Sequence, residues 1–251
     1  GTEVVVSEFC FAVYPIVTHL FGGKLVTVPA QNLGHDLSAM LRAVTPQTAV
    51  VFVAYPNNPT GTLAPRREIE ELVTQVPDSV LLVMDEAYID FLEDAPDLVP
   101  LIQSKPNLLL MRTFSKIYGL AGLRLGYGIG HPDLIAAFEK VRQPFNINSL
   151  IQAGAVAALD DEDHLAATKR NNSGGLQFFY EELQKLNLEF VRSAANFVLV
   201  KVGNGQKVFE AMQKVGVITR PMAGYKLPEW IRVTVGTPDE NRRCLAALKT
   251  A

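Results

Sequence analysis

Five side chains with chemical potential follow short apolar runs of this sequence, at the points where strands are expected to end. They are a carboxamide, a carboxylate, a phenol, an amine and a guanidinium: Asn58, Asp85, Tyr88, Lys116 and Arg124. In open α/β sheets, ligands bind at the carboxyl ends of the strands. We therefore expect these five side chains to meet at one edge of a sheet.

Lys116 has the clearest reactivity of the set. It lies between Phe114-Ser115 and Ile117-Tyr118-Gly119-Leu120, with few charges nearby in the sequence. A partly desolvated lysine has a lowered pKa and becomes a nucleophile that can form a Schiff base. The alternative is a solvated lysine in a polar loop.

The other members of the set also have simpler interpretations. Asn58 lies in Tyr55–Thr62, where Pro, Asn and Gly are also the usual residues of a turn. Asp85 could cap a following helix or serve as a buried anion. Arg124, within a glycine-rich apolar stretch, is costly unless an anion meets it, and an internal salt bridge would satisfy it equally well. Glu86 is expected to be structural.

Several other chemistries fail on spacing. Gly126–Gly130 does not match the dinucleotide pattern, and no Ser or Thr follows Lys24 as a phosphate-binding loop requires. The histidines are scattered without metal-ligand spacing, so no metal site is expected. Ser115 and Lys116 are adjacent, which is a poor arrangement for a Ser–Lys hydrolase.

The composition is that of an ordinary folded protein. The chain has 251 residues and 27.5 kDa, is 48% hydrophobic and 20% charged, and has a net charge of −3. This balance favours neither nucleic acid nor an anionic membrane as a partner. Cys10 and Cys244 lie far apart and are expected to be free thiols of a cytoplasmic protein. No apolar run approaches the roughly 20 residues that span a bilayer.

Hydrophobic patterning predicts an α/β fold. Wholly apolar runs, typical of strands covered on both faces, alternate with helical patterns, as in βαβ units with a mostly parallel sheet. The expected strands are Glu3–Val6, Lys24–Val28, Thr48–Val53, Val80–Met84, Leu108–Arg112 and Leu125–Ile129, with helices at Pro65–Val76 and Pro132–Val141. Because a strand is expected from Glu3, the chain is expected to begin inside its sheet, without a leader or a first helix.

The pattern changes near residue 150. Long helices are predicted at Ser149–Leu159 and Asp163–Leu186, followed by strands at Leu188–Val191, Phe197–Lys201 and Ile231–Val235 and helices at Lys207–Val215 and Pro238–Lys249. We expect a three-layer α/β domain over residues 1–150. A helical connection and a smaller α+β domain are expected over residues 151–251.

Taken together, the five side chains match the needs of one cofactor. Pyridoxal phosphate requires a lysine for its aldehyde, a carboxylate for its pyridine nitrogen, and a cation with hydroxyls for its phosphate. With these residues the chain resembles the fold-type I aminotransferases, most closely the histidinol-phosphate aminotransferases. The motifs that carry the resemblance are Pro-Asn-Asn-Pro-Thr-Gly (56–61), Asp-Glu-Ala-Tyr (85–88), Thr-Phe-Ser-Lys with Gly-Leu-Ala-Gly-Leu-Arg-Leu-Gly-Tyr (113–127) and Trp-Ile-Arg-Val-Thr-Val-Gly-Thr (230–237).

The resemblance implies a role for each matching residue. Lys116 would be the Schiff-base lysine and proton shuttle, Asp85 would pair with the pyridine nitrogen, and Asn58 and Tyr88 would bind the phenolate oxygen. The phosphate would be held by Thr113, Ser115 and Arg124. Phe11 matches the residue that stacks on the ring, or is a core phenylalanine. The residues that match substrate-facing positions are Asn196, Arg220 and Arg232. For Arg220 a surface salt bridge is the alternative.

The implied activity is transamination of histidinol phosphate with 2-oxoglutarate or glutamate, in histidine biosynthesis, by a cytoplasmic homodimer. The alternative is an aminotransferase of aromatic or other amino acids on the same fold. The resemblance also implies that the family's N-terminal part is missing here, including a glycine-serine turn that binds the cofactor phosphate and an arm that reaches the partner subunit. A truncated fragment without activity is therefore a further alternative.

Overall fold

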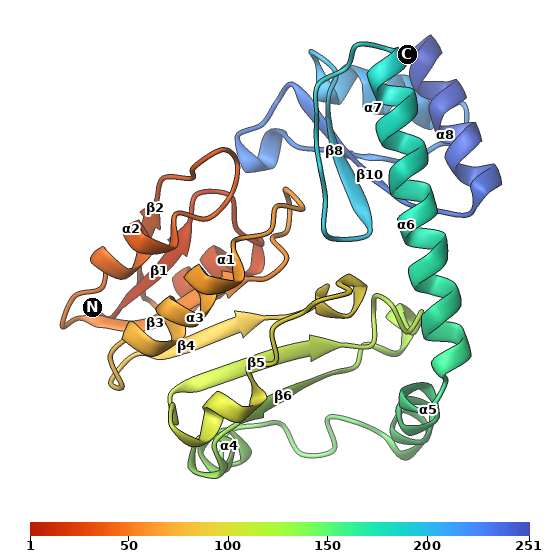
Figure 1. The fold of residues 1–251 in the computed structure, drawn as a ribbon. Helices are drawn as coiled ribbons and strands as arrows, with labels where there is room; N and C mark the ends of the chain where they lie inside the picture. Colours follow the sequence, from red (N-terminus) through yellow and green to blue (C-terminus); the bar gives the residue numbers. More distant parts are fainter.

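The computed structural model describes residues 1–251 and contains two sheets (Figure 1). The larger sheet has the order β2-β1-β3-β4-β5-β6. Its strands are β1 (Glu3–Ser7), β2 (Lys24–Val28), β3 (Thr48–Ala54), β4 (Leu81–Asp85), β5 (Leu108–Thr113) and β6 (Gly126–Gly130). All neighbouring pairs are parallel except β5–β6.

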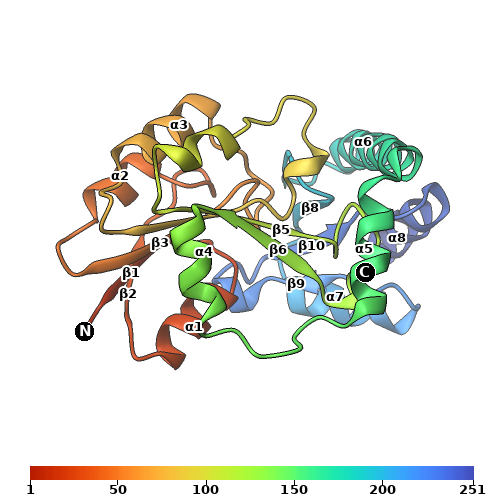
Figure 2. The ribbon, with the colours of Figure 1, turned by 90° about the horizontal axis from the view of Figure 1, so that it is seen from below.

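Helices cover both faces of this sheet, which explains why its strands are apolar throughout. On one face, α2 (Leu37–Arg42) and α3 (Arg66–Gln75) form the main core with side chains such as Val53, Leu82 and Met84. On the other face lie α1 (Val13–Leu20) and α4 (Pro132–Glu139), as the view in Figure 2 shows. The result is three layers with the strand ends left free at one edge.

The second sheet is smaller and antiparallel, with the order β7-β8-β10-β9. Its strands are β7 (Phe190–Val191), β8 (Phe197–Lys201), β9 (Arg220–Pro221) and β10 (Trp230–Thr234). A separate core forms between this sheet and α6 (Glu162–Lys185), α7 (Gly205–Lys214) and α8 (Pro238–Thr250). Together with α5 (Ser149–Leu159), the long helix α6 links the two sheets (Figure 1).

The predicted fold class is confirmed, and the predicted elements are present with ends that differ by at most two residues. Four short 3₁₀ turns complete the chain, at Ile89–Phe91, Val99–Gln103, Ala121–Leu123 and Ala223–Tyr225. No helix combines the length and the apolar character needed to cross a membrane.

The sequence patterns missed α1, α2 and β9. Helix α1 has only eight residues and no side-chain cap, so it lacks the usual start signal. Helix α2 has six residues, too few to show a helical period, although Asp36 caps it by accepting from the Ala39 amide at 2.8 Å. Strand β9 is two residues long and contains Pro221.

The main core offers a direct test of this layering. Leu82 is the second residue of β4 and is 1% exposed. Replacing it by alanine removes buried methyl groups and leaves a cavity, so Leu82→Ala is expected to lower the free energy of unfolding by about 2–5 kcal/mol. Urea denaturation followed by circular dichroism measures this loss. The matched control is Leu63→Ala, because Leu63 is 43% exposed. Equal losses in the two variants would contradict the assignment of Leu82 to the core.

Candidate active site

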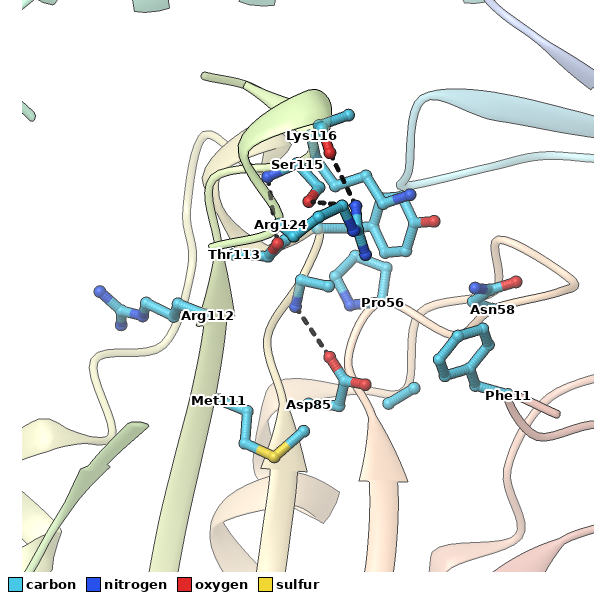
Figure 3. A pocket seen from close by; sticks show the side chains of 14 residues that line it. Phe11, Pro56, Asn58, Asp85, Met111, Arg112, Thr113, Ser115, Lys116 and Arg124 are labelled. Carbon is cyan, nitrogen blue, oxygen red and sulfur yellow. Dashed lines mark hydrogen bonds between the residues drawn. The ribbon is translucent and has the colours of Figure 1, made fainter. Parts of the chain in front are cut away.

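A cavity of about 340 Å³ lies at the carboxyl edge of the larger sheet (Figure 3). Three parallel strands, β3, β4 and β5, end side by side there, with Ala54 opposite Asp85 and Asp85 opposite Met111. The loops that leave these strands therefore converge on one space. All eight side chains expected to bind the cofactor line the cavity: Phe11, Asn58, Asp85, Tyr88, Thr113, Ser115, Lys116 and Arg124.

Lys116 lies in the turn that follows β5, where the Gly119 amide donates to its carbonyl oxygen at 3.0 Å. Its Nζ is 5.2 Å from the centre of the Tyr88 ring. Burial lowers the pKa of Lys116, and the positive charges of Arg232 and Arg124 lower it further, while Asp85 opposes the shift. The direction of this shift agrees with the expectation from the sequence.

Asp85 is the last residue of β4 and faces the cavity (Figure 3). Its Oδ1 accepts a hydrogen bond from the Ala87 amide at 3.1 Å, and its Oδ2 accepts one from the Tyr14 hydroxyl at 2.6 Å. Burial raises the pKa of Asp85, whereas these two hydrogen bonds and the charge of Lys116 lower it. Asp85 is therefore a largely buried anion that closes a short turn at Ala87. It does not cap the 3₁₀ turn that follows, which is preceded by Tyr88, so the cap interpretation was wrong.

Two hydroxyls and a guanidinium form another wall of the cavity. The Thr113 hydroxyl accepts from the Ser115 amide at 3.1 Å, and the Ser115 hydroxyl accepts from Arg124 Nη1 at 3.5 Å. Arg124 Nη1 also donates to the Ala121 carbonyl oxygen at 2.7 Å. One cation and two hydroxyls thus lie together on one wall of the cavity, as an anion-binding site requires.

The sequence argument about Arg124 was wrong in one respect. Its side chain is exposed, because it follows the 3₁₀ turn at Ala121–Leu123 in a left-handed conformation with φ of 53°. The apolar residues beside it in the sequence do not bury it, so no desolvation cost demands a partner. It also forms no salt bridge, and its hydrogen bonds go to a carbonyl and a hydroxyl.

The second sheet contacts the cavity wall through Arg232 on β10, which does not itself line the cavity. Arg232 Nη1 donates to Asn58 Oδ1 at 2.6 Å, and its guanidinium lies 4.6 Å from the centre of the Phe197 ring. Burial lowers the pKa of Arg232, and its buried Nε has no hydrogen-bond partner. A buried cation with an unused donor is suited to an anionic ligand.

The other two residues expected to face the substrate, Arg220 and Asn196, also do not line the cavity. Arg220 on β9 is exposed, forms no ion pair, and sits opposite Arg232 in the β9–β10 register. Asn196 is partly buried, and its carbonyl oxygen accepts from the Val235 amide at 2.9 Å. The structure thus brings the two arginines together and leaves Asn196 on the segment that leads into β8.

Phe11 is partly buried at the cavity wall (Figure 3). Its ring meets the edge of the Tyr14 ring at a centroid distance of 5.8 Å and packs against a small apolar cluster that includes Cys10. Phe11 therefore serves as a core side chain and also exposes a face to the cavity.

The sequence reasoning missed Tyr14, whose hydroxyl contacts Asp85 from α1. The only signal was its position three residues after Phe11, which places both on one face of a helical turn. Tyr88 behaves as expected for a phenol in an enclosed site. Burial raises its pKa to about 12, with the charge of Arg232 opposing this rise.

A buried ion pair lies beside the site. Glu86 is fully buried, and its Oε2 accepts from Arg112 Nε at 2.8 Å. Burial raises the pKa of Glu86, and Arg112 opposes the shift. Glu86 follows Asp85 and Arg112 precedes Thr113, so the pair joins the ends of β4 and β5. The structural role expected for Glu86 is thus a link between two strands that carry site residues.

This ion pair gives a prediction about stability. Arg112→Met leaves the Glu86 carboxylate buried without a cation, which is expected to lower the free energy of unfolding by about 3 kcal/mol. The pKa of Glu86 then rises further above its unfolded value, so the unfolded state releases a proton that the folded state retains. The destabilisation should therefore be larger at pH 8 than at pH 5.

Urea denaturation at the two pH values measures the effect. The double variant with Glu86→Gln is expected to recover part of the loss and to remove its pH dependence, because no buried carboxylate remains. A loss that is the same at both pH values would contradict the assignment.

The chain matches the family of class I and II aminotransferases over residues 1–248. It is 47% identical over 251 residues to histidinol-phosphate aminotransferase 1 of Nitrosococcus oceani, covering 99% of this chain and 68% of that protein. The structure of histidinol-phosphate aminotransferase from Sinorhizobium meliloti in complex with pyridoxal-5'-phosphate superposes with a TM-score of 0.88 at 31% identity, covering all of this chain and 70% of that one. A tetra mutant of Thermus thermophilus aspartate aminotransferase gives a TM-score of 0.87 at 26% identity, with 100% and 73% covered.

Proposed function

This chain belongs to the class I and II aminotransferases, and we propose that it transaminates histidinol phosphate with 2-oxoglutarate or glutamate in histidine biosynthesis, with pyridoxal phosphate as cofactor. One observation carries the proposal. Lys116 and Asp85 line the same cavity, and they come from neighbouring strand ends. An aminotransferase of aromatic or other amino acids remains the second candidate, because a pair of arginines suits a phosphate and a carboxylate alike.

The charges of the cavity fit the cofactor. Asp85 forms no ion pair and carries only two neutral donors, which suits a protonated ring nitrogen. Arg124 forms no ion pair either, and it stands with the hydroxyls of Thr113 and Ser115, which suits a phosphate. The cavity thus offers an uncompensated anion and an uncompensated cation at different walls.

When bound, pyridoxal phosphate supplies an electron sink for the charge left on the substrate carbon. Lys116 Nζ, whose pKa is lowered, more readily holds a free lone pair, so it can bind an aldehyde and later take up and return a proton. Asp85 holds the ring nitrogen protonated. Asn58 and Tyr88 are proposed to orient the phenolate oxygen, and Phe11 to cover the ring.

Substrate recognition is proposed to involve Arg232, Arg220 and Asn196. Arg232 has an unused buried Nε and would bind the carboxylate of glutamate. Arg220, opposite it in the register, would join it on the phosphate of histidinol phosphate. Two adjacent guanidinium groups repel each other, and a doubly charged anion between them removes that repulsion.

The proposal also covers the domains of the chain, its oligomeric state and its location in the cell. Residues 1–150 would be the cofactor-binding domain and residues 151–251 the connection and the small domain, which the two separate cores support. A homodimer is proposed, supported by the exposed apolar side chains of Ile16, Leu20 and Phe21 on and after α1. Cytoplasmic location is supported by the two free thiols, Cys10 and Cys244.

The proposed role of Lys116 can be tested by spectroscopy. Added pyridoxal phosphate is expected to give an absorbance band that resists dialysis and disappears on treatment with borohydride, because hydride reduces the C=N bond to Nζ to a single bond and the cofactor stays attached. Lys116→Ala should lack this protein-bound band. The control is Lys105→Ala, because Lys105 pairs with Asp78 at 3.1 Å and precedes β5, at the end of that strand opposite the cavity. An equal band in Lys116→Ala would contradict the proposal.

The substrate can be tested by steady-state kinetics with histidinol phosphate and phenylalanine. We expect kcat/KM to favour histidinol phosphate. Arg220→Gln should reduce that value by about tenfold or more, while reducing the value for phenylalanine much less, because only one substrate carries the phosphate. Arg242→Gln is the control, since Arg242 pairs with Asp239 on the surface of α8. A preference of the unaltered chain for phenylalanine would favour the second candidate.

A further inference from the structure

A tyrosine beneath the cavity contacts Asp85. Tyr14 is 2% exposed, and its hydroxyl donates to Asp85 Oδ2 at 2.6 Å. This distance is short for an O–H···O bond, as expected when the acceptor is an ionised carboxylate. Tyr14 does not line the cavity, so it can act on a ligand only through Asp85.

The Tyr14 ring packs against two aromatic rings. It stacks on Phe52 of β3, with a centroid distance of 4.6 Å and an angle of 6°. The Phe11 ring packs edge-to-face with it. In addition, the Thr18 hydroxyl donates to the backbone carbonyl oxygen of Tyr14 at 2.7 Å. The hydroxyl position is therefore set by packing against the strand next to β4.

The direction of the hydrogen bond is fixed by the charges. Burial raises the pKa of Tyr14, and the negative charge of Asp85 raises it further, so the phenol keeps its proton. An ionised carboxylate can only accept, so Tyr14 is the donor. Oδ1 receives the Ala87 amide, so each oxygen has one donor and keeps acceptor capacity for a ligand.

The other ionisable groups around this pair are few. Lys116 acts on Asp85 from the turn after β5, and Tyr88 lies near it from the turn after β4. Cys10 lies near Tyr14, and burial raises the pKa of its thiol to about 11, so it stays neutral. The neighbouring residues of β3, Phe52 and Ala54, carry no charge. Tyr14 is thus the only side chain that donates a hydrogen bond to Asp85.

We propose that Tyr14 is a positioning residue for the reaction, which keeps the Asp85 carboxylate ionised and oriented so that it can hold the ring nitrogen of pyridoxal phosphate protonated. The inference rests on the proposed function. A hydrogen bond to a charged group stabilises the charged form, and without Tyr14 the burial of Asp85 is opposed only by the Ala87 amide and by Lys116.

Tyr14→Phe tests the proposal, because it removes one hydroxyl and keeps the ring. In the chain without cofactor, the pKa of Asp85 is expected to rise relative to the unaltered chain, since the donor that lowers it is lost. Carboxyl ¹³C NMR of the aspartates measures this titration, and the Asp85 signal is identified by its absence in Asp85→Asn. The control is Tyr180→Phe, which removes a hydroxyl that bonds the Ser193 backbone and does not contact Asp85.

With cofactor added, two further changes are expected in Tyr14→Phe. Pyridoxal phosphate should bind about tenfold more weakly, as expected for the loss of a hydrogen bond to a charged group. In addition, ¹⁵N NMR of pyridoxal phosphate labelled at the ring nitrogen should show deprotonation at a lower pH than in the unaltered chain. A purely structural role would lower the thermal unfolding midpoint without moving this titration.

The outcomes separate the two proposals. Unchanged titrations of Asp85 and of the ring nitrogen in Tyr14→Phe would overturn the role of Tyr14, as would shifts of equal size in Tyr180→Phe. If the unaltered chain gives no Lys116-dependent band with pyridoxal phosphate, the proposed function fails. The Asp85 titration in the cofactor-free chain then decides alone: a raised pKa in Tyr14→Phe supports the control of Asp85 by Tyr14, and an unchanged one overturns it.

Discussion

Asp85 and Lys116 are opposite charges that share one enclosed cavity without forming an ion pair, and most of the surrounding structure serves to keep them in that state. If the two groups met, each would neutralise the other, and neither would be available to a ligand. Instead, Lys116 Nζ lies over the Tyr88 ring, and Asp85 is bound by two neutral donors. Burial raises the pKa of Asp85 and lowers the pKa of Lys116, so burial favours the neutral form of each group and makes proton transfer easier.

This separation depends on the layered sheet. Three parallel strands end together, and each contributes its own loop, so that groups far apart in the chain meet at fixed spacing. The Glu86–Arg112 pair joins two of these ends from within the protein. The antiparallel strand β6 begins beside Arg124 at the cavity edge, where Gly126 pairs with Thr113, and runs back along β5 away from the cavity. Rigid strands therefore position the polar groups, and the loops carry them.

The second sheet completes the site from the other side. Arg232 reaches Asn58 across the gap between the sheets, and Phe197 of β8 meets the edge of the Tyr88 ring at 5.4 Å. Behind them the backbones touch, since the Ala194 amide donates to the Gly61 carbonyl oxygen at 2.8 Å. Gly61 has φ of 78°, and a Cβ there would lie 2.3 Å from the Ser193 hydroxyl, so only glycine permits this approach.

The sequence alone determined the fold class, most of the elements and eight of the side chains that line the cavity. This was possible because wholly apolar strands indicate a sheet that is covered on both faces, and because the polar groups follow those strands directly in the sequence. Only the tertiary structure revealed Tyr14, the exposure of Arg124 and the contact between Arg232 and Asn58. These facts depend on which elements pack against each other, and neighbours along the chain carry no information about a partner 71 or 174 residues away.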